Sequence, residues 1–172
     1  MLDVLKNKIK EAGGFVNAHA HLDRANTSHF FSKKDQYKFL EEKWKLVDRI
    51  KKDSNYWDYF NRIDTTVSDQ IKKGVTTICT FVDVDAVTTS KAYIAAREVA
   101  RRQKDITLLT ATQTLKGVLD PEYDVLMRNA IVSTNIIGSL PGGDKGREDE
   151  HIDWIMNAAK KYGKRVHVHV DQ

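Results

Sequence analysis

Short apolar runs rich in β-branched residues alternate along the chain with longer stretches whose apolar residues recur every three or four positions. The first pattern is typical of strands buried on both faces, and the second of helices that bury one face. Five strands are predicted, around residues 17–21 and over residues 75–84, 106–112, 135–140 and 165–170. Because helical stretches separate these strands, the order predicts parallel β/α units and therefore an α/β fold.

The connection after the first strand is long, about residues 25–73, and contains two helical stripes. Each stripe places apolar residues at helical spacing: Leu40, Trp44 and Val47 in the first, and Phe60, Ile63, Val67 and Ile71 in the second. Both stripes are expected to pack in the core rather than to form a ligand cage. Residues 53–57, between the stripes, are expected to form a lid or entrance.

The 172 residues are 41% hydrophobic and 30% charged, which is typical of one soluble globular unit. The net charge of +4 is spread along the chain, so no nucleic-acid partner is expected. The single cysteine, Cys79, is expected to be a buried thiol, and without a disulfide framework the expected compartment is the reducing cytoplasm. No apolar run approaches the roughly 20 residues of a membrane span, so no membrane partner is expected either.

Two histidines, His19 and His21, are separated by one residue near the start of the chain. Alternate residues of a strand point to the same face, so both imidazoles are directed the same way and supply half of a divalent-metal site. His167 and His169 repeat the arrangement in the last predicted strand. A barrel of parallel strands is a fold that brings such distant strands to one place.

The His-x-His followed by Leu22-Asp23, the five ordered strands and the terminal His169-Val170-Asp171 resemble the metal-dependent amidohydrolase superfamily, specifically its cytosine deaminase-like branch. The resemblance begins at about Gly14 and implies a (β/α)8 barrel, which typically needs about 250 residues. Residues 1–172 are therefore expected to be the N-terminal portion of one such TIM barrel, strands one to five with flanking helices. No β-sandwich is expected before the barrel, and strands six to eight are expected to be absent.

The resemblance implies that His169 is the third metal ligand beside His19 and His21. His167 has the same parity but lies one layer deeper, so it is expected to support the ligands or to pack. Three neutral imidazoles suit one divalent ion, Zn²⁺ first, with Fe²⁺ or Mn²⁺ as alternatives. In the family a further histidine and a catalytic aspartate follow in strands six and eight, so the chain as given is expected to be an incomplete catalyst.

The resemblance also implies roles for polar residues at strand ends. Gln172 stands where cytosine deaminases have a proton-shuttling glutamate, so it is the expected catalytic residue, although a glutamine orients without titrating. Gln113 is expected to bind a small planar substrate with an N–H beside a C=O. Asp23 is expected to orient a neighbouring loop or ligand, and Arg24 to be a substrate contact or a solvated charge.

The expected function is hydrolysis of a non-peptide carbon–nitrogen bond, in the manner of a cyclic amide or amidine deaminase. The alternative is a non-catalytic, metal-binding or self-associating fragment. Five strands of eight leave two open edges, at strands one and five, which are templates for pairing with another chain. Self-association, or docking with the missing half of the barrel, is therefore expected.

Overall fold

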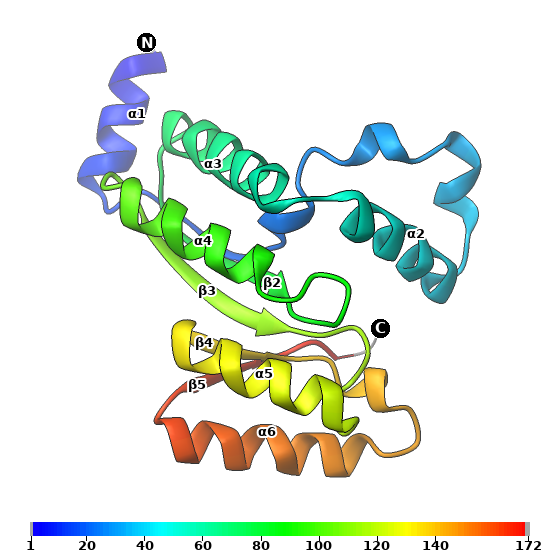
Figure 1. The fold of residues 1–172 in the computed structure, drawn as a ribbon. Helices are drawn as coiled ribbons and strands as arrows, with labels where there is room; N and C mark the ends of the chain where they lie inside the picture. Colours follow the sequence, from blue (N-terminus) through cyan, green and yellow to red (C-terminus); the bar gives the residue numbers. More distant parts are fainter. Residues whose placement is uncertain (1, 171–172) are drawn as a thin grey trace.

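The structure is a computed structural model that describes residues 2–170. They form a curled sheet of five parallel strands whose order in space follows their order in the chain (Figure 1). The strands are β1 (Phe15–Ala20), β2 (Val75–Asp83), β3 (Thr107–Gln113), β4 (Ile136–Ser139) and β5 (Arg165–Val168). The predicted α/β fold, a partial (β/α)8 barrel with strands one to five, is confirmed.

Six helices accompany the sheet in the described part of the chain: α1 (Leu2–Glu11), α2 (Leu40–Asp53), α3 (Tyr56–Lys72), α4 (Lys91–Arg102), α5 (Pro121–Ser133) and α6 (Glu148–Tyr162). Short 3₁₀ turns, η1 (Leu22–Arg24), η2 (Ser28–Phe30) and η3 (Lys33–Tyr37), follow β1, and η4 (Pro141–Asp144) follows β4. Among residues 2–170 no helix combines the length and the apolar character that crossing a membrane requires.

Local sequence explains where the helices begin and end. Asn55 accepts hydrogen bonds from the backbone N–H groups of the first turn of α3, and Gly74, with a φ of +89°, follows the C-cap residue Lys73 at its other end. Asp120 caps α5 in the same way, and Pro121 occupies the first helical position, where no N–H is needed.

The two faces of the sheet follow the alternation of side chains along each strand. On the outer face, Ile78, Val82 and Leu108 pack with buried residues of α3 and α4 in one apolar cluster, and Ile137 packs with residues of α5 and α6 in another. The buried stripe of α3, including Phe60, Ile63 and Val67, is part of the first cluster, so its predicted place in the core is confirmed.

The inner face carries a smaller apolar group at its centre, formed by Cys79, Phe81 and Ala111. Cys79 is buried, as predicted, and burial raises the pKa of its thiol. Gly138 of β4 lies against this group, and a Cβ on Gly138 would come within 1.8 Å of the Thr112 carbonyl oxygen and 2.8 Å of the Phe81 ring. A glycine is therefore required for β4 to lie close to β3 over Phe81.

The connection between α2 and α3 differs from the prediction. Only Ser54 and Asn55 separate the two helices, and the hydroxyl of the buried Ser54 donates to the Ile50 carbonyl at 2.6 Å. The prediction of a lid at residues 53–57 is wrong, because these residues form a tight helix-to-helix turn and its capping contacts.

Substituting Gly138 tests how closely the inner face is packed. We expect Gly138→Ala to lower the free energy of unfolding by about 3 kcal/mol, because the new methyl group overlaps backbone and the Phe81 ring. Urea unfolding followed by circular dichroism measures the change. Gly142→Ala is the matched control, since a Cβ there meets nothing within 4 Å and the expected change is below about 0.5 kcal/mol. Equal losses in the two variants would contradict the packing argument.

Candidate metal centre

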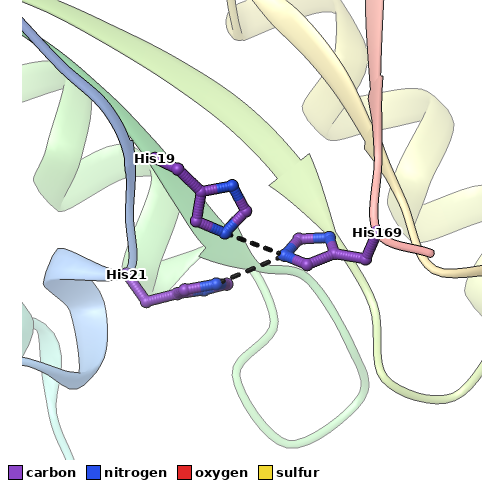
Figure 2. Close-up of side chains that lie close together, drawn as sticks. All are labelled: His19, His21 and His169. Carbon is purple, nitrogen blue, oxygen red and sulfur yellow. Dashed lines mark hydrogen bonds between the residues drawn. The ribbon is translucent and has the colours of Figure 1, made fainter. Parts of the chain in front are cut away.

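Three histidines from opposite ends of the chain meet at one mouth of the curled sheet (Figure 2). His19 belongs to the end of β1, His21 follows it directly, and His169 follows β5. The Nε2 atom of His169 lies 3.2 Å from Nε2 of His19 and 3.4 Å from Nε2 of His21. Nitrogen atoms that share one tetrahedral zinc ion lie about 3.3 Å apart, so the spacing fits a single ion of this kind.

A single aromatic ring supports the cluster from below. The Phe81 ring centroid lies 4.4 Å from that of His169, 4.7 Å from His19, 4.8 Å from His167 and 5.3 Å from His21. Phe81 is fully buried beneath these imidazoles. The four histidines of the two His-x-His pairs therefore all pack against the same buried aromatic ring.

The rings are held as neutral imidazoles. Burial lowers the pKa of His19, and the nearby His167 lowers it further. Burial, and then the charge of Arg24, lowers the pKa of His21 to about 3. Burial also lowers the pKa of His169, against a smaller opposing effect of its hydrogen bond to Ser139. A neutral ring is the form that ligates a metal.

His169 presents a free lone pair to the centre. The Nδ1–H of His169 donates to the Ser139 carbonyl oxygen at 3.2 Å, which leaves its Nε2 lone pair directed at the other two rings. The Nδ1 atom of His19 lies 3.5 Å from Nε2 of His167, so its own Nε2 also faces the centre. His167 thus contacts a cluster histidine instead of joining the group.

His21 is restrained differently, because Nη2 of Arg24 lies 2.6 Å from its Nδ1. An arginine only donates, so Nδ1 of His21 is the acceptor and the hydrogen of the neutral ring sits on Nε2, the atom that faces the centre. Arg24 has other partners within reach, since its Nε lies 3.8 Å from Asp83 and 4.0 Å from Asp23. The donor set fits a divalent ion, and the contact with Arg24 opposes binding at His21.

The turn that carries Arg24 is fixed against the end of β2. The Leu22 N–H donates to the Thr80 hydroxyl at 3.0 Å, and the Asp83 N–H donates to the Asp23 carboxyl at 2.9 Å. Burial, and then the charge of Asp83, raises the pKa of Asp23 to about 6. Asp23, in η1, is thus held beside the histidines by its contact with β2, the strand next to β1.

A buried lysine, which the sequence patterns did not single out, completes this charged layer. Lys51 of α2 is 2% exposed, and its ammonium lies 2.9 Å from Asp83 and 2.7 Å from Asp85. Burial opposes the charge of Lys51, but the two carboxylates outweigh it and raise the pKa of the ammonium. Burial on its own would raise the pKa of Asp83, but the positive charges of Arg24 and Lys51 outweigh this effect and hold the pKa at about 2. The sequence feature that could have indicated the burial of Lys51 is its position four residues after Val47, on the same apolar stripe.

A cavity of about 340 Å³ opens beside the histidines. Its walls include His21, His169, Gln113, Phe31, Trp44 and Val47. The volume falls within the range of small-molecule sites, about 300–1,000 Å³. Trp44 and Val47 line this space, so the expectation that their stripe packs wholly in the core is wrong. The side chain of Leu40 lies outside the described part.

Gln113 lies in the cavity wall, as does Arg24, the other residue for which a substrate contact was predicted. The side chain of Gln113 is 2% exposed, and its Oε1 is buried without a hydrogen-bond partner within residues 2–170. An unsatisfied buried acceptor costs free energy unless a ligand or water satisfies it. Gln172, the predicted catalytic residue, lies outside the described residues.

No family model matches the chain. A protein of Haemophilus influenzae (strain ATCC 51907 / DSM 11121 / KW20 / Rd), described as uncharacterized, is 38% identical over 178 residues, which cover 98% of this chain and 63% of that protein. The chain thus spans less than two thirds of the length of this relative.

Solved structures of similar fold include 5-methylcytosine deaminase from Klebsiella pneumoniae. Its complexes with 5-fluorocytosine and phosphonocytosine both have a TM-score of 0.82, at 25% and 26% identity, over 91% of this chain and 38% and 39% of theirs. N-isopropylammelide isopropylaminohydrolase from Burkholderia multivorans ATCC 17616 has a TM-score of 0.76 at 20% identity, over 92% of this chain and 40% of its own, and shows the fold alone. These similarities confirm the predicted resemblance to cytosine deaminase-like enzymes.

Removal of one imidazole tests the metal centre. We expect His169→Ala to weaken Zn²⁺ binding by more than about 100-fold, since loss of even an outer hydrogen-bond partner of a ligand costs about 10–100-fold. Competition with a chromophoric chelator measures the affinity. The exposed His29, outside the group of three, supplies the control His29→Ala. Unchanged affinity in the His169 variant would exclude the centre.

Substitution of Arg24 is expected to have the opposite effect. In Arg24→Gln the positive charge is removed and an amide oxygen can accept from Nδ1–H of His21, so Zn²⁺ binding should become about tenfold tighter. The matched control is Arg62→Gln, since Arg62 also lines the cavity but donates to Ser54 and contacts no ligand histidine. Weaker binding in the Arg24 variant, measured with the same chelator, would show that Arg24 assists the centre.

Proposed function

We propose that this chain supplies the metal-binding and ring-binding half of an active site that hydrolyses a carbon–nitrogen bond of a small nitrogen heterocycle. The observation that carries the proposal is the convergence of three neutral imidazoles beside a cavity whose wall holds the unpartnered amide oxygen of Gln113. The proposal includes residues 1–172 as the N-terminal portion of one amidohydrolase-like barrel. The similarity to 5-methylcytosine deaminase supports the type of reaction.

His19, His21 and His169 would hold one divalent ion, for which Zn²⁺ is the first choice and Fe²⁺ or Mn²⁺ the alternatives. Such an ion, when bound, supplies Lewis-acid activation of water near neutral pH. The part of the chain that the structure describes adds no carboxylate to this group of ligands. We therefore expect the described residues to bind and orient a substrate without completing the reaction.

Gln113 gives the cavity its selectivity. A primary amide accepts a hydrogen bond at Oε1 and donates one at Nε2, so it matches a ring edge with an N–H beside a C=O. Because Oε1 is buried, a ring without the matching N–H leaves it unsatisfied and binds more weakly. The aromatic walls Phe31 and Trp44 offer flat apolar surface to the rest of the ring.

Asp23 and His167 support the centre rather than contact the ion. Asp23 fixes the turn after His21 to β2, and His167 lies against Nδ1 of His19. The catalytic role of Gln172 stays a prediction from the sequence.

A non-catalytic role, as a metal-binding or self-associating unit, is the second candidate. The observation that favours it is the exposure of apolar side chains on both edge strands, Phe15 and Val16 on β1 and Val168 on β5. In this role the centre would bind metal, but the cavity would not select a ring.

Ring binding by the zinc-loaded chain separates the two candidates. We expect calorimetry to show that cytosine or a hydroxylated aminotriazine binds, and that Gln113→Leu weakens binding at least about tenfold while zinc stoichiometry is unchanged. Gln70→Leu, in α3 and outside the cavity lining, is the matched control.

Zinc binding without any ring binding would overturn the proposal in favour of the non-catalytic role. Ammonia release by the chain alone, followed with cytosine, pterins and triazines, is expected to be absent. Its appearance would show that the site needs no further residues.

A further inference from the structure

A serine, a histidine and an aspartate form a continuous hydrogen-bonded row at the end of β4. The His151 Nδ1–H donates to Asp144 Oδ2 at 2.6 Å, and His151 Nε2 lies 2.9 Å from the Ser139 hydroxyl. Ser139 ends β4, Asp144 ends η4, and His151 belongs to the first turn of α6. We call these three residues the buried triad.

The order of atoms in the buried triad is that of a hydrolase nucleophile, its base and the acid that orients the base. The buried triad does not have that role here, because a substrate cannot reach the Ser139 hydroxyl. Ser139 is 2% exposed and His151 is fully buried, and neither lines the cavity beside the histidines. A substrate carbon therefore has no path to the Ser139 hydroxyl.

The buried triad does reach the metal centre, through the backbone of Ser139. The Ser139 carbonyl oxygen accepts the backbone N–H of His169 at 2.9 Å and the imidazole Nδ1–H of the same residue at 3.2 Å. This one carbonyl fixes both the position of His169 and the tautomer that leaves Nε2 free. Whatever holds Ser139 in place also sets the ring of His169.

The other end of the buried triad is tied to the loop after β3. Asp144 Oδ2 also accepts the Val118 N–H at 2.7 Å, and Oδ1 accepts the Leu119 N–H at 3.4 Å. That loop leaves β3 at Gln113, the residue in the cavity wall. One carboxylate therefore joins the strand that carries Gln113 to the strand end that holds His169.

We propose that the buried triad is a positioning device for His169, in which His151 locks Ser139 so that its carbonyl holds the His169 ring with Nε2 directed at the metal centre. The proposal rests on the metal site of the proposed function. It concerns the orientation and tautomer of a ligand, so it is also testable in the metal-free chain.

Two substitutions of His151 separate the two hydrogen bonds of its ring. In His151→Gln the terminal amide lies near the former Nε2, so the bond to Ser139 is kept and the bond to Asp144 is lost. In His151→Asn the shorter amide lies near the former Nδ1, so the opposite bond is kept. Each variant loses one buried hydrogen bond, and their losses of stability are expected to be similar.

Zinc affinity and imidazole ¹⁵N spectra are measured for both variants, with Val67→Ala as a control that destabilises the core of α3 away from the site. We expect H151N to bind Zn²⁺ at least about tenfold more weakly, and His169 to lose its Nδ1–H tautomer in the metal-free spectrum. H151Q and the control are expected to retain both properties.

Equal losses of affinity in H151N and H151Q, or losses that simply follow stability, would overturn the proposal. Labelling of Ser139 by a fluorophosphonate in the unsubstituted chain would also overturn it, because an accessible nucleophile contradicts a purely positioning role. If the unsubstituted chain bound no metal, the proposed function would fail, while the tautomer of His169 would still report on the buried triad.

Discussion

The site depends on the curl of the sheet, which brings the end of β1 within imidazole reach of the end of β5. Strands that lie first and fifth in an open sheet are about 19 Å apart, since neighbours are separated by about 4.8 Å. Here Nε2 of His19 and Nε2 of His169 are 3.2 Å apart. Phe81 fills the concave face beneath both rings, and Gly138 leaves room for it. The concave face is therefore packed by one large side chain, Phe81, against a glycine that leaves room for it.

A second constraint is the burial of charge next to the cluster. Lys51, Asp83 and Asp85 are almost completely shielded from solvent, and removal of one partner from such a pair costs about 3–5 kcal/mol. The pairs join α2 to the carboxyl end of β2, so this helix is held over the cavity rather than on the outside of the barrel. The position of Trp44 in the cavity wall follows from the same attachment.

The sequence was informative where the physical signal was local. Apolar runs and helical stripes placed all five strands within a few residues, and the two His-x-His pairs identified the ends of the sheet that meet. Residues whose roles depend on distant partners were missed. The position of Lys51 on the apolar stripe of α2 hints at burial, but the carboxylates that stabilise its charge, Asp83 and Asp85, lie more than 30 residues away. Ser139, Asp144 and His151 are joined only once η4 folds back onto α6. Trp44 was assigned to the core because hydrophobic periodicity does not distinguish a core wall from a cavity wall.

The three imidazoles are not equivalent, and the difference follows from what each Nδ1 contacts. His169 donates to a carbonyl that is itself anchored, so its Nε2 lone pair is preorganised on the β5 side. His21 accepts from a guanidinium, so its Nε2 carries hydrogen until that contact is released. Arg24 has carboxylates within 4.0 Å to which it can turn, which makes release a rotation of one side chain rather than a rearrangement of the sheet. An ion binding at this centre would therefore find the Nε2 lone pair of His169 already in place. His21 could bind it only after Arg24 had left Nδ1 of His21 for a carboxylate.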